Sequence, residues 1–157
     1  MSTQNNKAIC LAFLETVYTE GRHDDLINKV IASDAVDHEL APYALPYMTT
    51  PQMLAMFLTF YKRAFPDLQI EIQDMLAEGD RVATRWRLRG THTGPLMGID
   101  PSQQRIDVGG LRIDRFANGK IVETWGSWDL LGLLEQIGAL PELRRVFYPE
   151  LRSVAAA

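Results

Sequence analysis

The sequence predicts a single α+β domain over residues 1–157, in which a strongly curved antiparallel sheet wraps around N-terminal helices and leaves an internal pocket. Two observations support a single domain of this class. Apolar residues recur at helical spacing as far as residue 65 and then alternate with polar residues as far as residue 128. The length suits one hydrophobic core rather than two. The connection over residues 93–104 is long for a compact domain, and such loops are often functional.

The first half of the chain is expected to contain three helices. An amphipathic segment over residues 2–20 ends at Gly21, and Asp24 can cap a short second helix. The third helix has the clearest start, because Thr49 and Gln52 have the spacing of a capping box.

A short strand is expected over residues 35–40, between the second and third helices. Alternation places Val36, His38 and Leu40 on one face, which we expect to be the inner face. A lone inward histidine is more often a hydrogen-bonded core residue than a catalyst. His38 nevertheless becomes a candidate for the pocket.

The second half is expected to form an antiparallel meander that ends in a helix. The strands are predicted at residues 68–77, 81–92, 105–117 and 120–128. Asn118-Gly119 is typical of a tight hairpin turn between the last two. A helix follows from about Asp129 to Ile137, and a last amphipathic segment is expected near residues 143–151.

Strand alternation selects side chains for the pocket. Trp86 and His92 share the apolar face of their strand, and the arginines between them face outward. On the next strand, a bulge at Gly109-Gly110 would turn Arg115 inward. A buried arginine there would need an anionic ligand or a carboxylate partner.

Asp129 follows two tryptophans, Trp125 and Trp128. Apolar surroundings raise the pKa of a carboxyl toward the range that is useful for proton transfer. Asp129 is also well placed to cap the helix that follows it, and the two roles are compatible. The sequence does not decide whether its side chain points into the pocket.

Composition excludes several other classes of function. A net charge of −4 provides no basic surface for nucleic acid or for an anionic membrane. No apolar run approaches the length of a membrane span, and the N-terminus lacks the features of a signal peptide, so we expect a cytoplasmic protein. Cys10 is the only cysteine, and the three histidines lack metal-ligand spacing, so we expect no metal site. Arginines and Trp125 on the outer sheet face suit a homodimer interface.

Six short segments stand in a distinctive order. They are Ala64-Phe65-Pro66-Asp67-Leu68, Gly79-Asp80-Arg81-Val82, Arg89-Gly90-Thr91-His92-Thr93-Gly94, Arg115-Phe116, Asn118-Gly119-Lys120-Ile121-Val122-Glu123-Thr124-Trp125, and Asp129 followed by Leu134-Glu135-Gln136-Ile137-Gly138. In this order and spacing they resemble the SnoaL-like polyketide cyclases, or ester cyclase family. The resemblance covers about residues 5–140 and leaves 141–157 as a C-terminal extension.

The resemblance implies the cone-shaped α+β fold called NTF2-like. It also implies a cofactor-free enzyme that closes a ring by intramolecular aldol condensation of a polyketide ester. In that family an aspartate near the start of the last helix is the acid/base, and Asp129 matches its position. The best-studied members have a histidine where this chain has Arg115, and an arginine cannot exchange protons near neutral pH.

The expected mechanism begins when Asp129 takes a carbon-bound proton from a small apolar carbonyl compound. His38, His92 or Arg115 would then donate a hydrogen bond to the enolate oxygen. The flat walls of the pocket would be Trp86, Trp125, Phe57 and Tyr61. Two alternatives stay open: isomerisation, dehydration or epoxide hydrolysis on the same fold, or a non-catalytic module that binds a small ligand.

Overall fold

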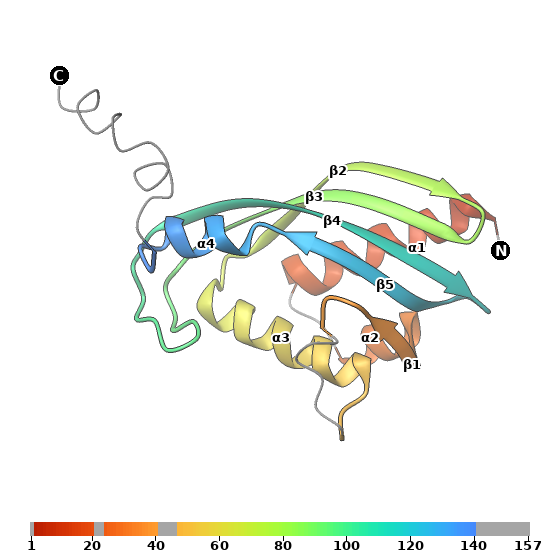
Figure 1. Cartoon of the computed structure of the whole chain (residues 1–157), viewed down its shortest axis with the longest axis horizontal. Coiled ribbons are helices and arrows are strands. Elements are labelled where there is room, and N and C mark those ends of the chain that lie inside the picture. The colour runs from red at the N-terminus through yellow and green to blue at the C-terminus, as the bar shows by residue number, and fades with distance from the viewer. Residues whose placement is uncertain (1, 21–23, 41–46, 141–157) are drawn as a thin grey trace.

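The computed structural model describes residues 2–20, 24–40 and 47–140, in which helices pack on one face of a five-stranded sheet (Figure 1). The strands are β1 (Ile31–Asp37), β2 (Gln69–Glu78), β3 (Arg81–Thr91), β4 (Arg105–Ala117) and β5 (Lys120–Trp128). The helices are α1 (Thr3–Glu15), which continues as the π-helical turn η1 (Thr16–Glu20), α2 (Asp24–Val30), α3 (Thr50–Ala64) and α4 (Leu130–Gln136). The expected segment near residues 143–151 lies outside the described residues.

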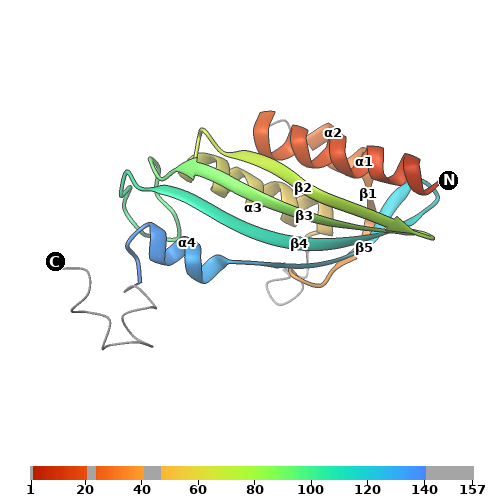
Figure 2. The same ribbon diagram turned by 90° about the horizontal axis from the view of Figure 1, so that it is seen from above.

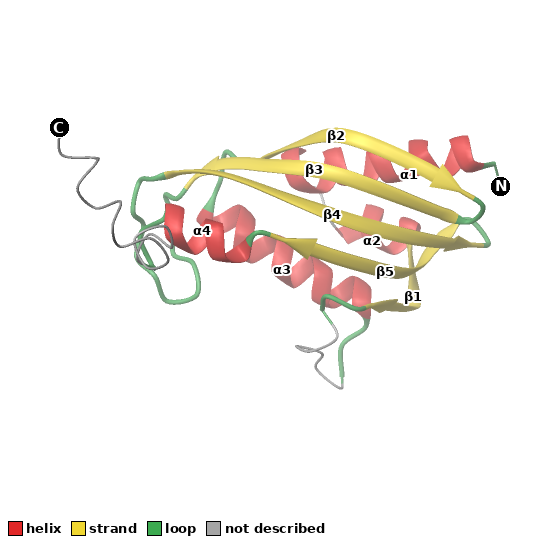
Figure 3. Ribbon diagram, turned by 45° about the horizontal axis from the view of Figure 1, so that its top comes forward, coloured by secondary structure: helices red, strands yellow, loops and turns green. Residues whose placement is uncertain are grey.

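The sheet has the strand order β1-β5-β4-β3-β2 (Figure 3). Strands β2 to β5 form the predicted antiparallel meander, and β1 adds a parallel edge strand beside β5. The helices α1, α2 and α3 lie on one side of this sheet, and α4 continues from the end of β5 (Figure 2). The predicted α+β class is confirmed, with β1 as the one parallel addition among the described strands.

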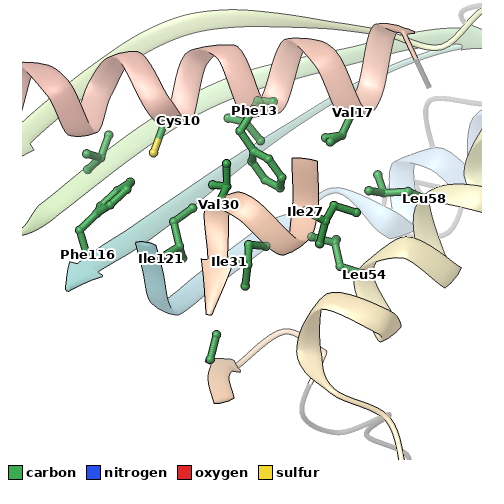
Figure 4. Close-up of a cluster of buried hydrophobic side chains, with 13 residues drawn as sticks. Cys10, Phe13, Val17, Ile27, Val30, Ile31, Leu54, Leu58, Phe116 and Ile121 are labelled. Atoms are coloured by element: carbon green, nitrogen blue, oxygen red, sulfur yellow. The ribbon is translucent and has the colours of Figure 1, made fainter. Parts of the chain in front are cut away.

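Two clusters of buried apolar side chains hold the helices on the sheet. One lies where α1, α2 and α3 face β4 and β5, and Phe13, Leu58 and Phe116 belong to it (Figure 4). The other lies toward α4 and includes Phe65 and Leu133. Burial on this scale is the main force that stabilises the fold.

The third helix begins as the sequence predicts. The backbone N–H of Thr49 donates to Gln52 Oε1 at 2.9 Å, and the backbone N–H of Gln52 donates to Thr49 Oγ1 at 3.5 Å. This reciprocal capping box satisfies two backbone donors at the start of α3.

The strand expected over residues 35–40 starts earlier and has the opposite phase. β1 begins at Ile31, directly after α2, and ends at Asp37. The Asp37 side chain accepts hydrogen bonds from the backbone N–H groups of Glu39 and Leu40, and these bonds turn the chain. Ala35 is buried, whereas Val36 is 47% exposed, so the inward orientation expected for His38 is wrong. Pairing with β5, with an irregularity between Ile31 and Val36, decides this phase.

The bulge expected at Gly109-Gly110 is also absent from the described pairing of β3 and β4, which runs in one register along both strands. Gly110 instead leaves room for the indole of Trp86, because a side chain at residue 110 would overlap that ring. Because the phase is not reset, Arg115 faces outward and the expectation that it points inward is wrong.

Candidate active site

A cavity of about 600 Å³ lies between the concave face of the sheet and α3. Its walls are mostly apolar, and a polar region of the lining contains Tyr18, Asp37, Glu39, Arg112 and Thr124. A volume of this size is typical of a site for a small organic molecule, in which a few polar groups fix the orientation of the ligand.

Aromatic side chains form much of the cavity wall, but Trp125, one of the four expected there, does not line it. Trp86, Phe57 and Tyr61 all line it. Trp128 also lines it and meets Tyr61 edge to face, with the ring centroids 5.6 Å apart. The placement of Trp86 depends on Gly110, which leaves room for the indole ring on the neighbouring strand.

Glu39 brings a carboxyl group into this apolar space. Its side chain lies against Gly126, where a methyl group would overlap Glu39 Oε2. Burial raises the pKa of Glu39, and the negative charge of Asp37 raises it further. Arg112 and the Trp128 side chain act in the opposite direction. A carboxyl with a raised pKa is a better proton acceptor than an ordinary carboxylate, which suits a group that takes up and returns a proton.

Arg112 and Asp114 form a buried ion pair beside Glu39's end of the cavity. Arg112 Nε donates to Asp114 Oδ2 at 2.9 Å, and Arg112 Nη2 donates to Asp114 Oδ1 at 2.5 Å. The two side chains are only 11% and 1% exposed. Burial would lower the pKa of Arg112, but the Asp114 carboxylate raises it above its usual range, so the guanidinium stays charged.

Tyr18 supplies a neutral hydroxyl to the same region of the cavity. It lies in the π-helical turn η1, and such turns occur frequently at functional sites. Burial raises the pKa of Tyr18 to about 12. The hydroxyl therefore keeps its proton and is a potential hydrogen-bond donor.

Asp129 lies at the start of α4, where its carboxylate caps the helix. Asp129 Oδ1 accepts a hydrogen bond from the backbone N–H of Gly132 at 2.7 Å. The side chain is exposed and is not among the residues that line the cavity. The capping role that the sequence allowed is the one seen in this geometry.

Three of the predicted site residues come together on the outer face of the sheet, away from the cavity. His38 Nε2 lies 3.0 Å from Glu123 Oε1, and Arg115 Nε donates to Glu123 Oε2 at 2.8 Å. The His38 ring stacks on Trp125 with 5.1 Å between centroids. The side chain of His38 is 44% exposed, as expected for an outer-face residue.

His92 is fully buried and anchors the 93–104 connection. The backbone N–H of Ser102 donates to His92 Nδ1 at 3.2 Å, and the ring packs against Phe65. Burial lowers the pKa of His92, so the neutral ring is favoured. His92 does not line the cavity, and its contacts are those of a core residue.

Alternation along β4 contained the signal for the residues that sequence reasoning missed. Counting from Ile106 and Val108 without a bulge places Arg112 and Asp114 on the inner face. Asp37 lies on the face of β1 opposite to the one expected to be inner, and Glu39 follows in the turn after β1, so no comparable signal identified them. In the described ranges, no cluster of three or more histidine, cysteine or acidic side chains could hold a metal ion. No described helix is long and apolar enough to cross a membrane.

Comparison with known proteins places this chain in a family. The family model described as SnoaL-like polyketide cyclase matches residues 8–137. AclR from Streptomyces galilaeus, a proposed hydroxylase, is 30% identical and matches with a TM-score of 0.77 over 99% of this chain and 94% of its own. IdmH from Streptomyces antibioticus, a proposed polyketide cyclase, is 28% identical, with a TM-score of 0.70 over 86% of this chain and 99% of its own.

TsrD from Streptomyces laurentii has the same fold, with a TM-score of 0.76, 24% identity and coverage of 89% of this chain and 99% of its own. Comparison with curated protein sequences gives no significant match. The family match spans most of the chain, and the similar structures share the NTF2-like architecture. The chain therefore belongs to the SnoaL-like polyketide cyclase family.

Proposed function

We propose that the protein catalyses a cofactor-free intramolecular aldol condensation of a polyketide-type ester or a related small apolar carbonyl compound. Family membership supports the reaction class, and the aromatic cavity supports a flat, apolar substrate. The observation that carries the proposal is the Glu39 carboxyl inside this cavity, with a pKa that burial raises.

The chemistry requires one group that takes up and returns a proton. The Glu39 carboxylate removes a proton from a carbon between two carbonyl groups, and the electron pair delocalises onto a carbonyl oxygen. This carbanion attacks a third carbonyl elsewhere in the same substrate, which forms the ring bond and leaves an alkoxide, and protonated Glu39 returns its proton to that alkoxide. The mostly apolar cavity supplies the orientation, because it holds both ends of one folded molecule together.

The resemblance assigns the acid/base role to Asp129, so the two carboxyl groups are competing candidates. Glu39 lines the cavity, whereas Asp129 is exposed and caps α4. We therefore propose Glu39 as the acid/base. The matched pair Glu39→Gln and Asp129→Asn tests this, since each replacement keeps the size of the side chain and removes its ability to exchange a proton.

The assay incubates each variant with linear 1,3-dicarbonyl esters that carry a further ketone at a ring-forming distance, and follows ring closure by NMR. We expect Glu39→Gln to lower turnover by about 10²–10⁴, the usual range for such a group, and Asp129→Asn to leave it within a few-fold. The reverse pattern would assign the role to Asp129. Failure of the wild-type protein to cyclise any ester of this class would contradict the proposed function itself.

Hydroxylation of the same class of substrate is a second candidate, favoured by the match to AclR along almost the whole chain. The two reactions differ in mass balance. Aldol ring closure leaves the mass of the substrate unchanged, whereas hydroxylation adds one oxygen atom and needs an external oxidant. Mass spectrometry of the product separates them in the same incubation.

A further inference from the structure

The buried ion pair leaves one part of the Arg112 guanidinium unused. Nε and Nη2 donate to Asp114, and Nη2 also lies 3.4 Å from Thr124 Oγ1. A guanidinium has five N–H donors, of which two are on Nη1. No residue in the described ranges accepts a hydrogen bond from Nη1, and Arg112 lines the cavity.

Asp114 fixes the guanidinium of Arg112 in this position. Besides Arg112, it accepts a hydrogen bond from Thr124 Oγ1 at 2.7 Å and another from Cys10 Sγ at 3.6 Å. Burial raises the pKa of Cys10, so the thiol stays protonated and can donate. With three neighbours directed at one carboxylate, the guanidinium is fixed rather than mobile.

The other charged and titratable groups around Arg112 come from η1, from the end of β1 and from the turn that follows β1. Tyr18 is a neutral hydroxyl, and Asp37 and Glu39 are acidic. In the proposed reaction, the proton moves to Glu39 and the negative charge moves to the substrate oxygen. Among the side chains that line the cavity, Arg112 is the fixed cation that this oxygen can meet.

We propose that Arg112 binds the enolate oxygen formed in the cavity, and that Asp114 is a positioning residue that directs the Nη1 donors toward it. The inference rests on the proposed function, because it requires a ligand that develops negative charge on oxygen. A fixed donor in a region with little water stabilises such an oxyanion strongly, because the site does not have to reorganise during the reaction. The site should therefore prefer the ionised form of a planar hydroxylated ligand.

The probe that tests this preference is 4-nitrophenol, whose ionised form has its own visible absorbance. In its ionised form it is a planar oxyanion. It cannot be cyclised, so the pKa measured for the bound probe does not depend on turnover. Titration of the probe bound to the full-length protein gives its pKa in the cavity. From the usual strength of a hydrogen bond to a charged group, we expect the pKa of the bound probe to lie about one to two units lower in the wild type than in Arg112→Met.

The matched control is Arg87→Met, since Arg87 also pairs with an aspartate, Asp107, but on the exposed outer face. It should leave the pKa of the bound probe unchanged. Glu39→Gln should lose turnover and still bind the ionised probe, which separates this inference from the proposed acid/base. Arg112→Met leaves Asp114 buried without its partner, so Arg112→Met/Asp114→Asn is the second variant if the first does not fold.

Two results would overturn the inference. One is an equal pKa of the bound probe in the wild type and in either Arg112 variant. The other is binding of the neutral phenol alone by the wild type. Neither result would refute ring closure by Glu39, which the ester assay measures separately.

Discussion

At the scale of single residues, the candidate acid/base depends on a glycine on the neighbouring strand. A Cβ at Gly126 would overlap Glu39 Oε2, which is the far end of a flexible side chain. Gly126→Ala should therefore cost little stability while it displaces the carboxyl group. We expect turnover to fall about 10–100-fold, because small displacements of a reacting group are costly. Ester cyclisation and thermal unfolding, measured on the same sample, check both halves of this prediction.

Gly110→Ala provides the contrasting control. There the new Cβ would overlap the indole of Trp86 and lie 2.8 Å from Trp128 Cβ, and both neighbours are rigid. Overpacking of this kind costs about 1–3 kcal/mol, so the main effect should be on stability. If Gly126→Ala showed the same loss of stability with normal turnover, the position assigned to Glu39 would be wrong.

At the scale of the elements, the π-helical turn η1 depends on a lysine from α3. Lys62 Nζ donates to the backbone oxygens of Tyr18 at 3.2 Å, Thr19 at 3.0 Å and Leu68 at 3.1 Å. All three ammonium donors are thus used to join η1, α3 and the residue just before β2. This contact fixes the turn from which Tyr18 reaches the cavity.

Lys62→Met should lower the free energy of unfolding by about 1–3 kcal/mol, because it leaves part-buried carbonyl groups without their donor. Arg63→Met is the neighbouring control, since Arg63 is exposed, and it should change stability by less than about 0.5 kcal/mol. Urea denaturation of both variants gives the comparison. Equal stabilities for the two would show that the lysine does not hold the turn.

At the scale of the whole molecule, the outer face of the sheet carries an apolar row across four strands. Leu76, Ala83, Ile113 and Trp125 are successive partners in the register of β2, β3, β4 and β5. Leu76 is 68% exposed and Ile113 is 41% exposed. Exposed apolar side chains in a contiguous row are typical of an interaction surface.

We predict that the protein is a homodimer that buries this row. Sedimentation equilibrium at micromolar concentration should give about twice the chain mass of 17.7 kDa. Ile113→Glu should shift the equilibrium toward the monomer, because it places a charge in the centre of the row. Leu11→Glu is the control, since Leu11 is an exposed residue of α1 on the other side of the sheet. A monomeric wild type would contradict the prediction.

The sequence alone determined the order of the elements and much of the cavity wall. Several of these features are local patterns: the capping box at Thr49, the hairpin turn at Asn118-Gly119 and the alternation of β3. Such patterns can be recognised in the sequence without knowing which residues they contact in the fold. Trp86 was identified for the same reason, since its strand has a single apolar face. The capping position of Asp129 was local as well.

Only the tertiary structure decided which face of β1 and of β4 points inward. Alternation allows two phases, and a shift of one residue exchanges every side chain between the two faces. On β4 the choice is made by contacts from other elements, with Trp86 against Gly110 and Cys10 against Asp114. The polar end of the cavity, with Glu39 and Arg112, therefore follows from packing between strands and helices that are distant in the sequence.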